Sequence, residues 1–175
     1  MEFANPGLVI AMLLFYVGFI FIINGLNILG RIGEKECGLW NFTISCFMFV
    51  VLIIAMVFQL FGVDTWLTVT GVLLFAFTYF GLGFNKVMGL DGRGLGWYCL
   101  LVAITTVPEA VRNFDLADWR MGVMWLIWGA CWFVFFLVLG LGKTKLAGVK
   151  LGWVVILVGI LTLWWPGYFM LRGWW

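Results

Sequence analysis

Apolar residues dominate six long stretches of the chain, and the charged residues collect in the short segments between them. The stretches without a charged side chain are 3–30, 37–63, 65–85, 94–108, 121–142 and 151–171. A helix of about 20 apolar residues crosses the hydrocarbon core of a bilayer, because it satisfies its backbone hydrogen bonds internally. The pattern therefore predicts an all-α integral membrane protein with six transmembrane helices. The expected spans are approximately 8–29, 39–61, 66–84, 95–111, 121–141 and 151–171.

Composition agrees with this class. The chain is 65% hydrophobic and 10% charged, with a mean hydropathy of +1.15, far from the usual values of a soluble domain. No polar linker separates one folded unit from another, so residues 1–175 are expected to form a single membrane domain. The four cysteines show no C-x-x-C pair and are interpreted as free packing thiols rather than metal ligands.

Six consecutive transmembrane helices place their loops alternately on the two faces of the membrane, and the basic residues are distributed unequally between these faces. One side holds Arg31, Lys35, Lys86, Arg93, Lys143, Lys145 and Lys150, and the other holds Arg112, Arg120 and Arg172. By the positive-inside rule the richer side is cytoplasmic, which places both termini outside. The net charge of +2 is thus read as a topology signal, and no nucleic-acid partner is expected.

Each even-numbered span opens with nearly the same tripeptide. The three copies are Gly38-Leu39-Trp40, Leu95-Gly96-Trp97 and Leu151-Gly152-Trp153. A period near 57 residues contains one odd span, one loop and one even span, so the chain reads as a two-helix hairpin made three times. Hairpins that each cross the membrane twice point the same way and are related by rotation about the membrane normal. This predicts a six-helix bundle around a central axis.

Ionisable side chains are missing from the middle of every span, and the chain contains no histidine. Proton relays, voltage sensors and ion-coupled pumps place such groups within the membrane. Membrane haem and copper sites usually need histidine ligands, and hydrolases need a nucleophile with a base. We therefore expect no enzyme, no catalytic residue, no cofactor and no metal. A passive pathway for a neutral solute, or a protein without a transport role, remains.

Aromatic residues line one face of the fifth span and part of the third. Trp125, Trp128 and Trp132 stand at i, i+3 and i+7, and Phe75 and Tyr79 stand four residues apart. Aromatic walls suit a small planar solute, whose polar edges would meet the Tyr79 hydroxyl and the indole N–H groups. The alternative is a packed core or a lipid-facing stripe.

Five segments, ordered along nearly the full chain, resemble the urea and short-chain amide channels of bacterial inner membranes. They are LLFYVG at 13–18, LLFAFTY at 73–79, GWY at 96–98, WLIWG at 125–129 and GILT at 159–162. The resemblance implies a homohexameric ring in a bacterial or archaeal cytoplasmic membrane. It also implies that each protomer, built from three repeated hairpins, encloses its own pore.

The same resemblance implies which residues shape that pore. They are Leu14, Val17, Phe21 and Asn24 of the first span, with Phe75, Tyr79, Trp125, Trp128 and Trp132. Asn24 is the best polar candidate for binding an amide, and a bridge between two helices is the alternative role. Asn41, Gln59, Thr105 and Thr162 are expected to tie helices together.

Two departures separate this chain from the acid-gated member of that family. The histidine-bearing outer loop after the second span shrinks here to about 62–65, so histidine-based acid gating is not expected. Val158 stands where the acid-gated channel has a glutamate, which removes an acceptor and tilts the expectation towards amides. Glu109, near the outer mouth, offers either an acceptor to solute N–H groups or a partner to Arg112.

Together these observations predict a passive channel for urea or short-chain aliphatic amides, surrounded by membrane lipid. Two other interpretations stay open. One is a non-transporting scaffold or assembly subunit of a membrane complex, and the other is a conduit for ammonia or carbon dioxide.

Overall fold

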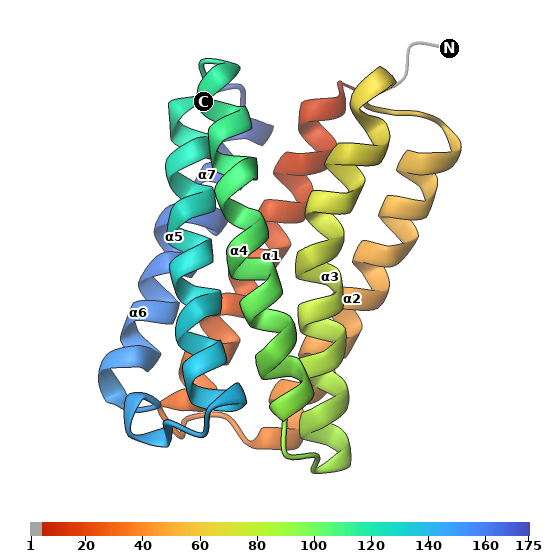
Figure 1. Cartoon of the computed structure of the whole chain (residues 1–175). Helices are drawn as coiled ribbons and strands as arrows, with labels where there is room; N and C mark the ends of the chain where they lie inside the picture. Colours follow the sequence, from red (N-terminus) through yellow and green to blue (C-terminus); the bar gives the residue numbers. More distant parts are fainter. Residues whose placement is uncertain (1–4) are drawn as a thin grey trace.

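The computed structural model describes residues 5–175, and its long elements are all helices (Figure 1). They are α1 Pro6–Ile28, α2 Glu34–Val57, α3 Thr65–Met88, α4 Arg93–Asp115, α5 Trp119–Phe135, α6 Val149–Gly159 and α7 Trp165–Leu171. A π-helical turn, η2 (Phe136–Gly140), extends α5, and a second, η4 (Ile160–Trp164), joins α6 to α7. The described residues thus form six helical rods long and apolar enough to cross a membrane. The predicted all-α class with six such helices is confirmed.

Short links join the rods. The chain turns at 29–33, 89–92 and 141–148 at one end of the bundle, where the last link contains η3 (Thr144–Leu146). It turns at 58–64, which contains η1 (Gly62–Asp64), and at 116–118 at the other end. The start of α1 and the end of α7 lie at this second end, the upper end in Figure 1. We call the two ends upper and lower in that sense.

Two polar side chains fix helix starts at the upper end. The Asn5 Oδ1 atom accepts from Gly7 N at 2.9 Å and caps α1. The Asp118 Oδ1 atom accepts from Met121 N at 3.1 Å and caps α5. Each bond satisfies a backbone N–H that the helix itself leaves unpaired. At the lower end Gly89, with φ of 69°, ends α3 in the left-handed region that glycine adopts without strain.

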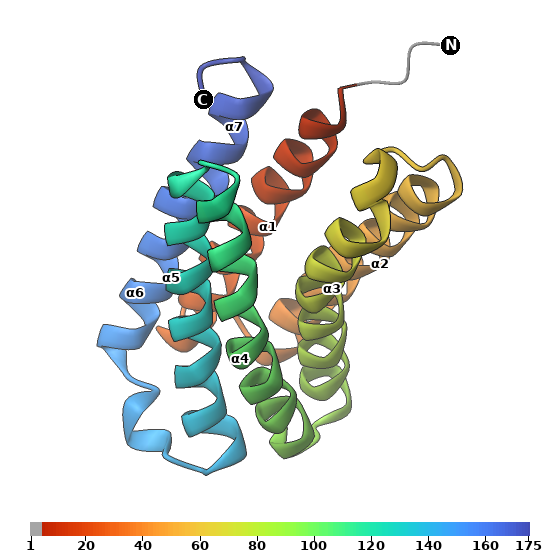
Figure 2. The ribbon, with the colours of Figure 1, turned by 45° about the horizontal axis from the view of Figure 1, so that its top comes forward.

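The rods form a closed ring in chain order, but neighbouring rods do not pack equally. In Figures 1 and 2, α2 runs beside α3 and α4 beside α5. The first rod, α1, packs mainly against α6 and α7. The two helices of each predicted hairpin, such as α1 with α2, make far fewer contacts. The closest pairs therefore join one predicted hairpin to the next.

Glycine contacts hold the three close pairs together at the lower end. The pairs are Gly38 with Gly83, Gly96 with Gly140, and Gly152 with Gly25. A Cβ on Gly83 would lie 2.7 Å from the Gly38 carbonyl oxygen, and one on Gly96 would lie 2.1 Å from Gly140 N. Small residues allow such backbone approach, which is how membrane helices gain packing energy. One glycine of each pair belongs to the repeated tripeptide. The other three glycines, Gly25, Gly83 and Gly140, recur with nearly the same period.

Large apolar side chains cover the outside of the bundle. Val57, Leu101 and Leu161 are each at least 60% exposed, and they lie on three different rods. Lipid hydrocarbon chains are as apolar as these side chains, so such a surface is stable in contact with lipid. The outer face of the ring therefore suits lipid or neighbouring protomers, while the inner face is available to shape a pathway.

Candidate functional site

Two cavities lie one above the other inside the ring. The upper cavity has a volume of about 250 Å³, and its walls include Leu14, Val17, Phe75, Trp125 and Trp128. The lower cavity has a volume of about 310 Å³, and its walls include Phe21, Asn24, Tyr79 and Trp132. The first-span residues selected from the sequence thus divide between the two cavities, with Leu14 and Val17 above Phe21 and Asn24.

A layer of aromatic rings separates the cavities. The Phe75 ring centroid lies 4.6 Å from that of Trp132, 5.2 Å from that of Trp128 and 5.8 Å from that of Trp125. The Tyr79 ring lies 6.3 Å from Phe75 and 6.5 Å from Phe21. Such edge-to-face and tilted contacts are the favoured geometries of aromatic pairs.

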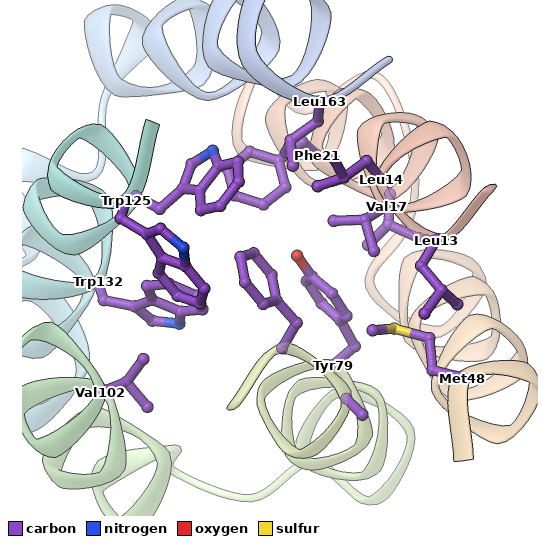
Figure 3. Packing of buried hydrophobic residues seen from close by; sticks show 14 of the residues in the cluster. Leu13, Leu14, Val17, Phe21, Met48, Tyr79, Val102, Trp125, Trp132 and Leu163 are labelled. Atoms are coloured by element: carbon purple, nitrogen blue, oxygen red, sulfur yellow. The ribbon is translucent and has the colours of Figure 1, made fainter. Parts of the chain in front are cut away.

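The tryptophan stripe of α5 faces the interior. Trp125, Trp128 and Trp132 are 7%, 1% and 4% exposed, which excludes the lipid-facing alternative. Figure 3 shows Trp125 and Trp132 on one side of the ring and Leu14 and Val17 of α1 on the opposite side. The interior thus lies between a wall of indole rings and a wall of aliphatic side chains.

Threonine hydroxyls orient two of the indoles. Trp128 Nε1 donates to Thr162 Oγ1 at 2.9 Å, and that hydroxyl donates to the Val158 carbonyl oxygen at 2.7 Å. Trp132 Nε1 donates to Thr78 Oγ1 at 3.1 Å, and Thr78 donates in turn within α3. Both N–H groups are therefore occupied, so the expectation that they meet a solute is wrong for these two rings. Sequence reasoning missed Thr78, whose partner stands 54 residues away.

Tyr79 carries a free polar group beside this layer. Its side chain is 2% exposed and lines the lower cavity. Within residues 5–175, its hydroxyl is the one buried side-chain oxygen or nitrogen without a hydrogen-bond partner. A buried hydroxyl without a partner is costly unless something else fills its bonding capacity.

Asn24 ties α1 to α2. Its Nδ2 donates to Asn41 Oδ1 at 3.2 Å, and its Oδ1 accepts from Asn41 Nδ2 at 2.6 Å. The Cys37 thiol also donates to Asn24 Oδ1, at 3.2 Å. The helix-bridging role weighed for Asn24 is therefore present, although the side chain also borders the lower cavity.

A neutralised charge pair stands at the lower mouth. Lys86 forms an ion pair with Glu34 and donates to Asn27 Oδ1 at 2.6 Å. All three side chains line the lower cavity. This group could not be predicted from the sequence, because Lys86 and Glu34 are 52 positions apart and share only their places at helix ends.

The upper mouth holds Glu109 within α4, in the wall of the upper cavity. Arg112 also lines this cavity, but its Nη2 atom pairs with Asp64 Oδ2 at 3.4 Å. Among the described residues no ion pair joins Arg112 to Glu109. The Glu109–Arg112 pair weighed from the sequence is therefore replaced by a bond between α4 and η1.

A closed ring of membrane-spanning helices, with two cavities stacked inside it and an aromatic layer between them, defines a membrane channel or transporter. The model of the AmiS/UreI family of transporters matches residues 9–174. The chain belongs to this family, as its resemblance predicted. It is a multi-pass membrane transport protein and not an enzyme.

Individual relatives are similar over most of the chain. A protein of Mycolicibacterium smegmatis, named as a transporter of amidate substrates, is 36% identical over 93% of this chain and 76% of its own length. The acid-activated urea channel of Helicobacter pylori strain J99 is 29% identical over 95% of this chain and 99% of its own.

Solved structures give the same result. The crystal structure of the Helicobacter pylori urea channel matches with a TM-score of 0.84 at 28% identity, covering 95% of this chain and 99% of that one. The cryo-electron microscopy structure of that channel in its closed state matches with a TM-score of 0.81, covering 94% and 98%.

Proposed function

We propose that this protein is a passive channel for urea or short-chain aliphatic amides, without histidine-based acid gating. The observation that carries the proposal is the aromatic layer between two cavities, with the unpartnered Tyr79 hydroxyl at its lower edge. The names of its relatives support the same solutes, since one is named for amidate substrates and another for urea.

The layer suits a small planar neutral solute. Urea and acetamide present flat faces that pass between aromatic rings, and polar edges that need a hydrogen-bond partner on the way. The Tyr79 hydroxyl offers one donor and one acceptor at that point. An ion finds no group there to replace its hydration shell. The layer therefore favours neutral solutes over ions.

Flux through the channel is proposed to be driven by the solute gradient alone. Charged residues that line the cavities stand near the two mouths, as Glu34 and Lys86 do below and Glu109 does above. The chain has no histidine, the side chain whose charge changes between about pH 5 and 8. We propose both termini outside, the basic links of the lower end in the cytoplasm, and a homohexamer with one pore in each protomer.

The direct test is solute flux into proteoliposomes, followed by light scattering after mixing with urea or acetamide. Wild-type protein should raise permeability above that of empty vesicles, with rates at pH 5 and pH 7 within about twofold of each other. Equal permeability of protein-containing and empty vesicles for both solutes would contradict the proposal. That result would favour a scaffold role.

The role of the hydroxyl is tested by Tyr79→Phe, with Tyr98→Phe as its control. Tyr79→Phe removes a hydroxyl that has no partner in the protein, so it should lower permeability without lowering thermal stability. The Tyr98 hydroxyl donates to the Leu74 carbonyl oxygen at 3.2 Å and joins α4 to α3. Tyr98→Phe should therefore lower stability and leave permeability near wild type. Unchanged flux in Tyr79→Phe would remove Tyr79 from the pathway.

A further inference from the structure

A carboxylate and an aromatic ring border the same open space in the upper cavity. Gly71 also lines this cavity and places no side chain in it. A Cβ there would lie 3.6 Å from Trp125 Cη2 and 3.8 Å from the Glu109 carboxyl carbon. Both side chains line the cavity, as does Phe75, whose ring contacts Trp125. The upper cavity thus combines a negative group with aromatic walls.

Within residues 5–175, Glu109 shares this space with a single cation, Arg112, whose guanidinium acts on it electrostatically but is itself paired with another carboxylate. Of the residues that the structure describes, three charged side chains line the upper cavity: Glu109, Arg112 and Asp118. Arg112 is paired with Asp64, and the Asp118 carboxylate caps α5. Among the described residues Glu109 forms no ion pair. The lower cavity differs, because its Glu34 is paired with Lys86. Negative charge is therefore in excess in the upper cavity.

Planar nitrogen cations match this combination of groups. A guanidinium ion presents paired N–H donors that fit a carboxylate bidentately, and its flat face stacks on an aromatic ring. It has nearly the shape of urea, and a cavity of about 250 Å³ can hold it. We propose that the upper cavity binds planar organic cations of the guanidinium class between Glu109 and Trp125.

Such a cation would stop at the aromatic layer. The rings of Phe75, Trp128 and Trp132 can stack on the cation but carry no negative charge, so in the layer it loses its hydration shell and the Glu109 carboxylate together. A bound guanidinium ion therefore occupies the solute path and blocks it. This second step rests on the proposed channel function, whereas binding itself does not.

Binding is measured with methylguanidinium, whose methyl protons report contact with the purified protein by saturation-transfer NMR. The test variant is Glu109→Gln, and the control is Asp115→Asn, which removes the same charge from the exposed end of α4. Wild type and the control should bind alike, while Glu109→Gln should bind roughly tenfold more weakly. Gly71→Ala should also weaken binding, since it fills the space and changes no charge.

Block is measured as acetamide flux into proteoliposomes with methylguanidinium on both sides and sodium chloride as the ionic control. Wild type and Asp115→Asn should be inhibited, and Glu109→Gln should need roughly ten times more cation. Binding that is equal in Glu109→Gln and Asp115→Asn would overturn the site. A protein that binds methylguanidinium through Glu109 but shows no basal flux would keep the site and overturn the channel function.

Discussion

At the scale of single residues, two threonine hydroxyls fix the orientation of the indole rings by accepting their N–H hydrogen bonds. Thr162→Val leaves the Trp128 N–H without its acceptor in a buried position. We expect a loss of about 1 kcal/mol of stability, since hydrogen bonds between membrane helices are worth about that much. Acetamide permeability should change as well, because the ring is free to turn. Thermal unfolding in detergent and vesicle flux measure the two effects.

Thr105→Val is the matched control for this substitution. The Thr105 hydroxyl donates only to the Leu101 carbonyl oxygen of its own helix. It should therefore leave both stability and flux close to wild type. Equal loss of stability in the two variants would show that the Trp128 bond contributes nothing of its own.

The sequence predicts the indole stripe but not its hydrogen bonds. The spacing of Trp125, Trp128 and Trp132 places them on one face, and their burial follows from that face being turned inward. Which hydroxyl each N–H reaches depends on how α5 sits against α3 and η4. Helix periodicity carries no information on that placement.

At the scale of helices, the glycine contacts decide how closely the rods approach. A Cβ on Gly96 would lie 2.1 Å from a backbone nitrogen of η2, so Gly96→Ala forces α4 and η2 apart. We expect a loss of about 3 kcal/mol, at the upper end for overpacking of a tight interface. Gly152→Ala should cost less, because its nearest atoms belong to the flexible Leu29 side chain. Melting temperature and the yield of folded protein measure the difference.

Gly94→Ala serves as the control for these variants. It lies in the same helix as Gly96, two residues earlier, and a Cβ there meets no atom within 4 Å. Alanine favours helix over glycine, so its stability should match or exceed wild type. A melting temperature of Gly96→Ala equal to that of Gly94→Ala would contradict the close contact.

The helices themselves follow from the sequence, whereas their pairing does not. Uncharged stretches of membrane length predict each rod, and the repeated tripeptides point to a threefold pattern. The odd-helix glycines at 25, 83 and 140 share that period. They become meaningful only when the structure brings them against Gly152, Gly38 and Gly96. Loops shorter than ten residues suggest that every two consecutive helices pack together. Of the consecutive pairs, however, only α2 with α3 and α4 with α5 pack closely, and the third close pair joins α1 to α6.

At the scale of the whole molecule, the six rods enclose their cavities within one chain. The cavity volumes of about 310 and 250 Å³ depend on how side chains of different size and shape pack in the space between the helices. Composition and periodicity fix neither volume, so the sequence predicts an axis but not its width. Because side chains of one protomer border both cavities from the lower mouth to the upper mouth, a single protomer can supply the groups of the proposed pathway.

This containment predicts that protomers of the proposed hexamer conduct independently. Gly71→Phe is a suitable substitution for blocking one protomer. A Cβ at position 71 makes only ordinary contacts, and the phenyl group beyond it would enter the upper cavity. Vesicles with the variant alone should show little acetamide flux. Rings assembled from wild-type and Gly71→Phe chains should conduct in proportion to the wild-type fraction, about half at an equal mixture. The alternative is one pathway at the centre of the hexamer, shared by all protomers. In that case Gly71→Phe would either leave the flux unchanged or make it fall far more steeply than the wild-type fraction.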